Sequence, residues 1–261
     1  MGLTRPRVGI VGGTGRMGSW FADLVERQGL EVFRTGRKTK LTPQDMVQQS
    51  DVVVVSVPIA DTIKVISEIG PLVPKNGLLM DLTSIKKGPV EAMLKNSQAE
   101  VVGAHPLFGP ENQDAASRKI ALCPARGERG PAWLTNVLEK AGMRIVIMDP
   151  DKHDRMMGLI QGVNHFSMLA LASCLSQSGF DFEEISDCST QTFRARLDRI
   201  RFIMAQPPDL FVSLLMDNPE AEKFIDQYQD AVESMAQIIR GGDRRTLGAL
   251  FRSLQAFYRI P

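Results

Sequence analysis

The sequence is poor in several residue types that mark particular classes of protein. Only three of its 261 residues are cysteines, Cys123, Cys174 and Cys188, and their spacing fits no metal-binding or redox motif. A sparse, odd number of cysteines is typical of a reducing compartment and argues against a disulfide scaffold. The N-terminal segment also lacks the long apolar run of a secretory signal. We therefore expect an unprocessed, cytoplasmic protein.

An excess of charge and long apolar runs are lacking too. The 31 lysines and arginines balance 30 aspartates and glutamates, which leaves a net charge of +1. A general binder of nucleic acid or of a membrane surface would need a strong basic excess. No stretch approaches about 18 uninterrupted apolar residues, so we expect no membrane span. No cluster of metal ligands is visible either. The remaining composition, 43% hydrophobic and 23% charged, is ordinary for a globular protein.

The first half of the chain alternates short apolar runs with amphipathic stretches. Near-continuous apolar runs indicate strands that are buried on both faces, and their alternation with helices predicts right-handed βαβ units and a parallel sheet. The expected strands are Val8–Val11, Glu31–Thr35, Asp51–Val57, Leu78–Leu82, Val101–Ala104, Lys119–Leu122 and Arg144–Met148. We therefore expect an α/β, Rossmann-type doubly wound domain over residues 1–150.

After Asp149 and Pro150 the pattern becomes helical throughout. Turn residues separate the helical stretches, and we find no convincing strand. The expected helices are His153–Ser176, Phe182–Gln206, Asp209–Met216, Pro219–Gly241 and Arg244–Tyr258. We therefore expect an all-α domain over residues 151–261.

A glycine-rich motif after the first strand predicts a dinucleotide site. Residues Gly12–Gly18 read GGTGRMG and contain GxGxxG, followed by a helical pattern and a second strand. The glycines permit a tight turn and close approach to a pyrophosphate, and the start of the helix attracts the phosphate. The predicted phosphate-binding residues are Gly13, Thr14, Gly15, Arg16, Met17 and Gly18.

The end of the second strand bears on the choice of dinucleotide. An acidic residue about 20 positions after the motif would bind the ribose 2′-hydroxyl of NAD. The segment here reads Arg34-Thr35-Gly36-Arg37-Lys38, with a hydroxyl and cations but no acid. This pattern suits a 2′-phosphate and favours NADP over NAD. The alternative is that Arg37 and Lys38 form an ordinary solvated turn.

Two further strand ends should line the same crevice. Ser56, Val57 and Pro58 follow the strongest strand, at the edge where open α/β sheets bind ligands. Ser84 follows the next strand, and its hydroxyl either caps the helix after it or faces a substrate.

The chain has three histidines, which can be considered one by one. His105 follows a strand end and precedes a Pro- and Gly-containing loop, so we expect a general base with a pKa near working pH. His153 begins a long helix, where we expect a surface role. His165 lies four residues after Gln161, which would put both on one helix face, either as a pocket wall or as a hydrogen-bonded core pair.

The ordered set of motifs GGTGRMG, VSVPI, DLTSIKKGP, GAHPLFGP, HDxxMxxIQxxxHF and AQPPDLF resembles the TyrA family of prephenate and arogenate dehydrogenases, from about Arg7 to Phe257. The resemblance implies a Rossmann domain, a helical domain that mediates dimerisation, and a small-molecule substrate. The implied reaction oxidises the ring C4 alcohol of prephenate by hydride transfer to NAD(P), with loss of CO₂, to 4-hydroxyphenylpyruvate. Arogenate would give tyrosine.

The resemblance also assigns roles to individual residues. His105 would hydrogen-bond the C4 hydroxyl and take its proton, and Ser84 would be a partner of both groups. His165 would lie on the substrate side of the crevice, with Gln161 as a further candidate contact. The apolar helix Met156–Leu175 would suit a buried dimer interface.

One departure from the family pattern concerns the substrate. Counting back from Pro207, Phe202 occupies the place of an arginine that binds a substrate carboxylate. Arg201 is adjacent, although one helical step turns a side chain by about 100°. The other possibilities are Arg194, Arg196 or Arg199, or a different substrate such as 4-amino-4-deoxyprephenate.

Two other functions stay open from the sequence. One is a hydroxyacid-type dehydrogenase, whose catalytic lysine is missing from the segment between His153 and Gly179. The other is a dinucleotide-binding sensor without catalysis. Because the two domains fill these 261 residues, we expect no fused chorismate mutase or regulatory domain of about 80 residues.

Overall fold

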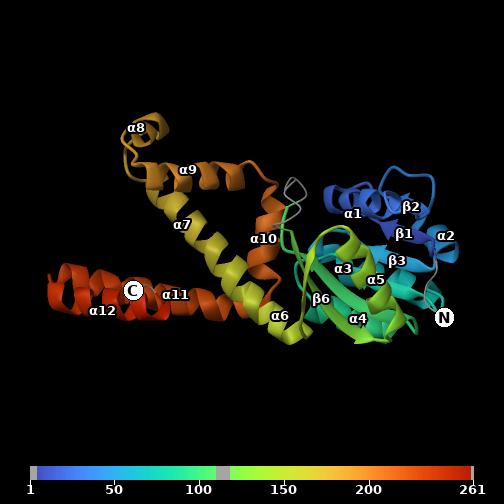
Figure 1. Cartoon of the computed structure of the whole chain (residues 1–261). Coiled ribbons are helices and arrows are strands. Elements are labelled where there is room, and N and C mark those ends of the chain that lie inside the picture. The colour runs from blue at the N-terminus through green and yellow to red at the C-terminus, as the bar shows by residue number, and fades with distance from the viewer. Residues whose placement is uncertain (1–4, 110–117, 260–261) are drawn as a thin grey trace.

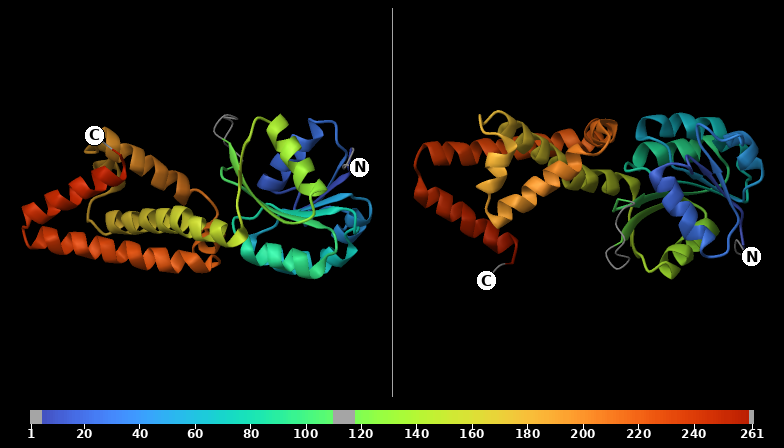
Figure 2. Two further views of the ribbon diagram at one scale, coloured as in Figure 1. Left: turned by 60° about the horizontal axis from the view of Figure 1, so that its bottom comes forward. Right: turned by 90° about the horizontal axis from the view of Figure 1, so that it is seen from above.

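The structure, a computed structural model, describes residues 5–109 and 118–259. Figure 1 shows two lobes side by side: a sheet flanked by helices, and an open arrangement of helices. The two views in Figure 2 show the same elongated outline. The chain passes once from the first lobe into the second, at the helix that begins at Pro150.

The first lobe contains one seven-stranded sheet in the order β2-β1-β3-β4-β5-β6-β7. The strands are β1 (Val8–Val11), β2 (Val32–Thr35), β3 (Val52–Val55), β4 (Leu78–Asp81), β5 (Glu100–Pro106), β6 (Lys119–Arg126) and β7 (Arg144–Ile147). This confirms the doubly wound sheet. The expectation of a wholly parallel sheet is wrong in one place, because β5 and β6 pair antiparallel. Only Leu107–Arg118 separates these two strands, and a parallel crossover normally needs a longer connection that contains a helix.

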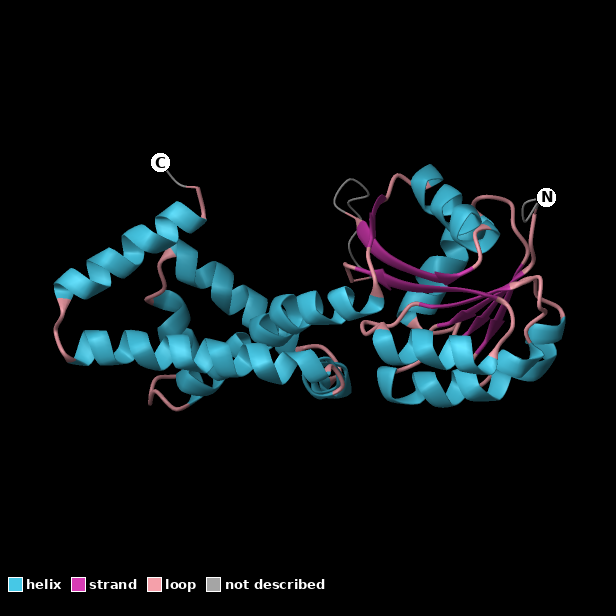
Figure 3. Ribbon diagram, turned by 90° about the horizontal axis from the view of Figure 1, so that it is seen from below, coloured by secondary structure: helices cyan, strands magenta, loops and turns pink. Residues whose placement is uncertain are grey.

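Helices cover both faces of the sheet, as Figure 3 shows. α1 (Arg16–Glu26) and α5 (Arg129–Lys140) pack on one face, and α2 (Pro43–Gln48), α3 (Ile59–Ile69) and α4 (Lys87–Asn96) pack on the other. Alternate residues of one strand serve the two cores: Val52 and Val54 join the α1 side, and Val53 and Val55 join the α3 side. All four valines are fully buried, which explains the uninterrupted apolar run in the sequence.

The second lobe is helical, and no described residue after β7 belongs to a strand. Its helices are α6 (Pro150–Met157), α7 (Asn164–Ser176), α8 (Phe182–Asp187), α9 (Gln191–Met204), α10 (Pro208–Met216), α11 (Pro219–Arg240) and α12 (Arg244–Phe257). The prediction of one helix over Phe182–Gln206 is wrong. Thr190 instead caps a new helix by accepting a hydrogen bond from the Phe193 N–H at 3.3 Å.

The first helix of this lobe contains a π-helical segment, Gly158–Val163, between α6 and α7. Its glycines face α11 at close range. A Cβ on Gly158 would lie 2.8 Å from the carbonyl of Glu220, and one on Gly162 would lie 2.9 Å from the Cβ of Ala221. The two helices therefore cross with their backbones nearly in contact, and the absence of these two side chains makes the crossing possible.

The helix Pro150–Ser176 is also long and apolar enough to cross a membrane by length and composition, with 11% of its most apolar window buried. The sequence alone had predicted no such segment. One helix of this kind is weak evidence for a span, because the core helix of a soluble protein meets the same criteria of length and composition. None of the residues of α7 is buried within the single chain.

We predict that Gly158→Ala lowers the free energy of unfolding by about 1–3 kcal/mol, because its methyl group would push α11 away from the π-helical segment. Gly248→Ala in α12 is the matched control. Its Cβ would meet only the Arg252 guanidinium, at 3.5 Å, so helix propensity should raise the stability by up to about 1 kcal/mol. Urea unfolding of both variants measures the difference, and equal effects would mean that the crossing tolerates a methyl group.

Candidate active site

The glycine loop lies at the carboxyl edge of the sheet, where β1 is flanked by β2 and β3 and the chain order reverses. Gly12 has a φ of +79°, and a Cβ there would lie 2.1 Å from the carbonyl oxygen of Ser56. A Cβ on Gly18 would lie 2.3 Å from the carbonyl oxygen of Gly12. The loop, the start of α1 and the segment after β3 therefore pack backbone against backbone. This brings Ser56 and Val57 next to the loop, and Pro58 follows as the N-cap of α3.

The start of α1 fits a pyrophosphate. Gly15 is the N-cap in extended conformation, no described side chain caps the helix, and its first turn has no acidic residue. The first N–H groups of the helix are thus open to an anion. Two motif residues that were predicted to bind the cofactor also contact other parts of the protein. Met17 packs against the hydrophobic core, and Arg16 donates a hydrogen bond to Gln206 of the helical lobe at 2.9 Å.

The end of β2 presents two cations beside this loop. A Cβ on Gly36 would lie 2.0 Å from Thr14 Oγ1, so the turn after β2 touches the glycine loop. Thr39 closes the turn through hydrogen bonds with Gly36. Arg37 and Lys38 at its tip are exposed and form no ion pair with any residue of 5–109 or 118–259. Thr35 is buried, and its hydroxyl has no described partner.

Arg34 in β2 is held by ion pairs with α1 and is not available to a ligand. Its guanidinium forms ion pairs with Asp23 and Glu26 of α1, at 2.9 and 2.6 Å. The hydrogen bond that this arginine donates to Glu26 is the main cause of its raised pKa. Any positive charge for a 2′-phosphate must therefore come from the turn beyond it.

His105 lies inside β5, paired with Ala121 of β6, and is 3% exposed. The sequence had placed it after the strand end. Its Nδ1 is 2.9 Å from Nε2 of His153, and the two rings meet edge to face at 5.1 Å. The predicted surface role for His153 is wrong, because its side chain is fully buried between β5 and α6. The position of His153 near the start of a helix does not reveal this burial, because the burial depends on how α6 packs against the sheet.

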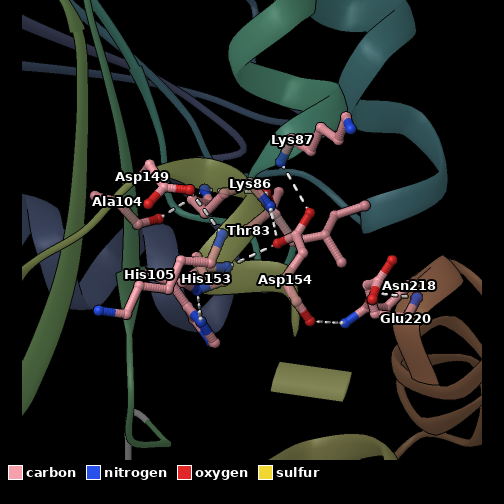
Figure 4. A network of polar contacts seen from close by, with 12 residues as sticks. Thr83, Lys86, Lys87, Ala104, His105, Asp149, His153, Asp154, Asn218 and Glu220 are labelled. Atoms are coloured by element: carbon pink, nitrogen blue, oxygen red, sulfur yellow. Dashed lines mark hydrogen bonds and ion pairs between the residues drawn. The ribbon is translucent and has the colours of Figure 1, made fainter. Parts of the chain in front are cut away.

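The hydrogen bonds link the tautomers of the two histidines to each other. Asp154 Oδ1 lies 2.7 Å from His153 Nδ1, and a carboxylate can only accept, so His153 donates from Nδ1. When His153 is neutral, its lone pair is on Nε2, which then accepts from Nδ1 of His105. The lone pair of His105 is therefore on Nε2. Asp154, His153 and His105 form an oriented relay that ends in a base (Figure 4).

Asp154 also ties the two lobes together. Its carboxylate accepts hydrogen bonds from the main-chain N–H groups of Lys86 and Lys87 at 2.7 and 2.9 Å, which caps α4. Its own carbonyl accepts from the side chain of Asn218 at 2.8 Å, and Asn218 in turn caps α11 by accepting from the Glu220 N–H. The sequence suggested Ser84 as the cap of α4. Ser84 is instead half-buried and forms no hydrogen bond with the described residues.

The environment of His105 lowers its pKa well below 6.5. Burial is the main cause, followed by the charges of His153 and Lys86. The expectation of a pKa near working pH is therefore wrong, because burial places the pKa well below 6.5 and disfavours the charged imidazole.

The third histidine faces a separate part of the helical lobe. His165 packs edge to face on Phe211 of α10, with ring centroids 4.9 Å apart, and its buried Nδ1 has no described partner. Burial lowers its pKa, and the charge of Arg199 lowers it further. Gln161 is half-buried in the π-helical segment, which ends between the two residues, so a four-residue spacing does not by itself place them on one face.

The arginines of α9 point in different directions. The guanidinium of Arg201 lies over the ring of Phe182, 5.1 Å from its centroid, on the side of α8. The guanidinium of Arg199 lies over the ring of Phe202, also at 5.1 Å, and its charge lowers the pKa of His165. The rotation of about 100° per residue separates these two positions on the helix.

Comparison with known proteins agrees with this arrangement. The family model for the prephenate dehydrogenase nucleotide-binding domain matches residues 26–147, and that for the prephenate dehydrogenase dimerization domain matches residues 149–254. A probable arogenate/prephenate dehydrogenase of Methanocaldococcus jannaschii is 30% identical over 260 residues, which is 92% of this chain and 58% of the relative. A T-protein of Enterobacter agglomerans is 27% identical over 97% of this chain and 68% of its own length.

A solved structure shows the same fold in both lobes. The prephenate dehydrogenase of Aquifex aeolicus, in complex with hydroxyphenyl propionate and NAD+, superposes with a TM-score of 0.79 and 18% identity over 99% of each chain. Both lobes, both matched models and the archaeal relative point to one family. The chain therefore belongs to the TyrA family of prephenate and arogenate dehydrogenases.

Proposed function

We propose that the chain is an NAD(P)-dependent dehydrogenase that converts prephenate or arogenate by oxidative decarboxylation, in tyrosine biosynthesis. The observation that carries the proposal is the oriented relay from Asp154 through His153 to His105, close to the carboxyl edge where the uncapped start of α1 lies. A non-catalytic sensor would have no use for a neutral, aligned base in this place.

The chemistry follows from the relay. A bound NAD(P) supplies the hydride acceptor. Nε2 of His105 takes the proton of the C4 hydroxyl while the C4 hydride departs, so the developing carbonyl never carries a full positive charge. The C1–carboxylate bond then breaks, CO₂ leaves, and the electron pair completes the aromatic ring. Positioned general-base catalysis of this kind contributes about 10²–10⁴-fold.

We propose His105 as the catalytic base and Ser84 as a second contact of the substrate hydroxyl. The glycine loop and the start of α1 would bind the pyrophosphate, and Ser56, Val57 and Pro58 would line the nicotinamide side. Arg37 and Lys38 would bind a 2′-phosphate, which favours NADP over NAD. Their exposure beside Thr14 supports this assignment.

We propose Arg199 in place of Arg201 as the cation that binds a substrate carboxylate. Its proximity to His165 puts a positive charge and an unpartnered imidazole nitrogen on the same side of the helical lobe. Gln161 would complete this side of the pocket. A guanidinium pairs with a carboxylate through two parallel hydrogen bonds.

We also propose a cytoplasmic homodimer formed through the helical lobe. Its family model is named for dimerization, and large apolar side chains of this lobe are exposed in the single chain. They include Phe180, Phe202, Met216, Ile239, Phe251 and Phe257.

The function is tested by initial rates with prephenate and arogenate, each with NAD and NADP, followed by nicotinamide absorbance. We expect turnover with at least one substrate and higher kcat/KM with NADP. His105→Asn should reduce kcat by about 10²–10⁴-fold and leave NADPH affinity unchanged, because it removes only the base. An unchanged kcat would remove His105 from the mechanism. No turnover with either substrate, with cofactor bound, would contradict the proposal and favour an amino-substituted analogue or a sensor.

The cofactor assignment predicts that Arg37→Ala weakens NADP binding by about 10- to 100-fold through loss of a charge-assisted hydrogen bond, with little change for NAD. Fluorescence titration with NADPH and NADH measures both affinities. Lys40→Ala, an exposed cation of the same loop, is the control. Equal losses for the two cofactors in Arg37→Ala would make this residue a bystander.

The carboxylate assignment predicts that Arg199→Ala raises KM by about 10- to 100-fold, because the substrate loses a charge-assisted pair. Arg201→Ala is the matched variant two residues away, and its KM should change less than threefold. Steady-state kinetics at saturating cofactor measure both. The reverse order of the two effects would restore Arg201 as the substrate arginine.

A further inference from the structure

A buried ion pair lies directly behind the relay. Lys86 and Asp81 are both fully buried, and the Lys86 ammonium contacts the Asp81 carboxylate. The ammonium also donates to the carbonyl of Ala104 at 2.9 Å, and Thr83 Oγ1 lies 3.4 Å from it. Moving two charges out of water costs several kcal/mol per ion, and their attraction often fails to return that cost. Stability alone is therefore a poor explanation for this pair.

Lys86 touches both ends of the relay. Its main-chain N–H donates to Asp154 Oδ1 at 2.7 Å, at the carboxylate end. Its side-chain ammonium holds the carbonyl of Ala104, the residue before His105, at the imidazole end. Lys86 thus connects Asp154, where the relay begins, with β5, the strand that carries His105. Figure 4 shows Lys86 between Ala104 and Asp154.

The charges around His105 come from a small set of groups. Lys86 lies before α4, Asp81 ends β4, and Asp154 and His153 belong to α6, with Asp149 at its N-cap. Cys123 of β6 remains uncharged, because burial raises the pKa of its thiol to about 12. The Lys86 charge acts on His105 in the direction that disfavours a second cation.

We propose that the Lys86–Asp81 pair positions the base: it fixes the distance between Asp154 and the strand of His105, and it places a buried cation beside the relay. Lys86 is a positioning residue and touches neither substrate nor cofactor. The inference rests on the proposed function for its catalytic consequence. The effect of the Lys86 charge on His105 can be measured without a substrate.

The test compares Lys86→Met with the double variant Asp81→Asn/Lys86→Met. The double variant removes both charges at similar volume, and proteins often tolerate the loss of both partners of a buried ion pair. It therefore remains informative if the single variant does not fold. Lys87→Met is the control, because the neighbouring lysine has an exposed side chain that pairs with Asp151.

NMR titration of the imidazole nitrogens between pH 4 and 9 follows His105, which is identified by its absence in His105→Asn. We expect the titration midpoint of His105 to rise in both Lys86 variants and to stay as in wild type in Lys87→Met. With an active enzyme, the acid limb of kcat/KM should move to higher pH in the same variants, and kcat should fall by about 10- to 100-fold with little change in KM.

The outcomes separate the two proposals. A folded double variant with the wild-type His105 midpoint overturns the inference, whatever the activity. A raised midpoint in an enzyme that turns over neither prephenate nor arogenate supports the electrostatic role and contradicts the proposed function. A fall in kcat without movement of the midpoint or of the acid limb would mean that Lys86 is only structural.

Discussion

The site depends on the hydrogen bonds that the carboxylate of Asp154 accepts. It accepts from two main-chain N–H groups at the start of α4 and from the imidazole of His153. The first two bonds dock the helical lobe on the nucleotide-binding lobe, and the third sets the tautomer of the relay. Because a carboxylate cannot donate, one group determines both the docking and the direction in which His105 offers its lone pair.

The glycine loop depends on a different constraint, namely backbone contact. Gly12 and Gly18 lie so close to neighbouring carbonyl groups that any Cβ would force the loop apart. The same closeness leaves the start of α1 open and puts the turn with Arg37 and Lys38 beside Thr14. The pyrophosphate and the neighbouring ribose of a dinucleotide would thus be bound by elements whose spacing is fixed by the absence of side chains.

Much of this arrangement could be predicted from the sequence, and the reasons for the exceptions are physical. Apolar runs such as Val52–Val55 reveal buried strands, and the glycine motif reveals the cofactor edge, because both signals are local. The burial of His153 and the partners of Asp154 depend on how α6 meets the sheet, which no local pattern encodes. The π-helical segment likewise lies where Gly158 contacts α11, far away in the sequence. The neighbouring pair His153-Asp154 in the helical motif was the one available signal, and a helix start is an ambiguous place for it.

The position of the relay limits how this protein can be taken apart or recombined. The base is on β5 of one lobe, whereas the residues that orient it are on α6, the first helix of the other. A nucleotide-binding lobe joined to a foreign helical partner would keep its glycine loop but would lose the hydrogen bond that sets the His105 tautomer. Binding of the dinucleotide would thus be a transferable property of the first lobe, whereas the proposed aligned base needs both lobes. In this family such shuffling would preserve recognition more easily than turnover.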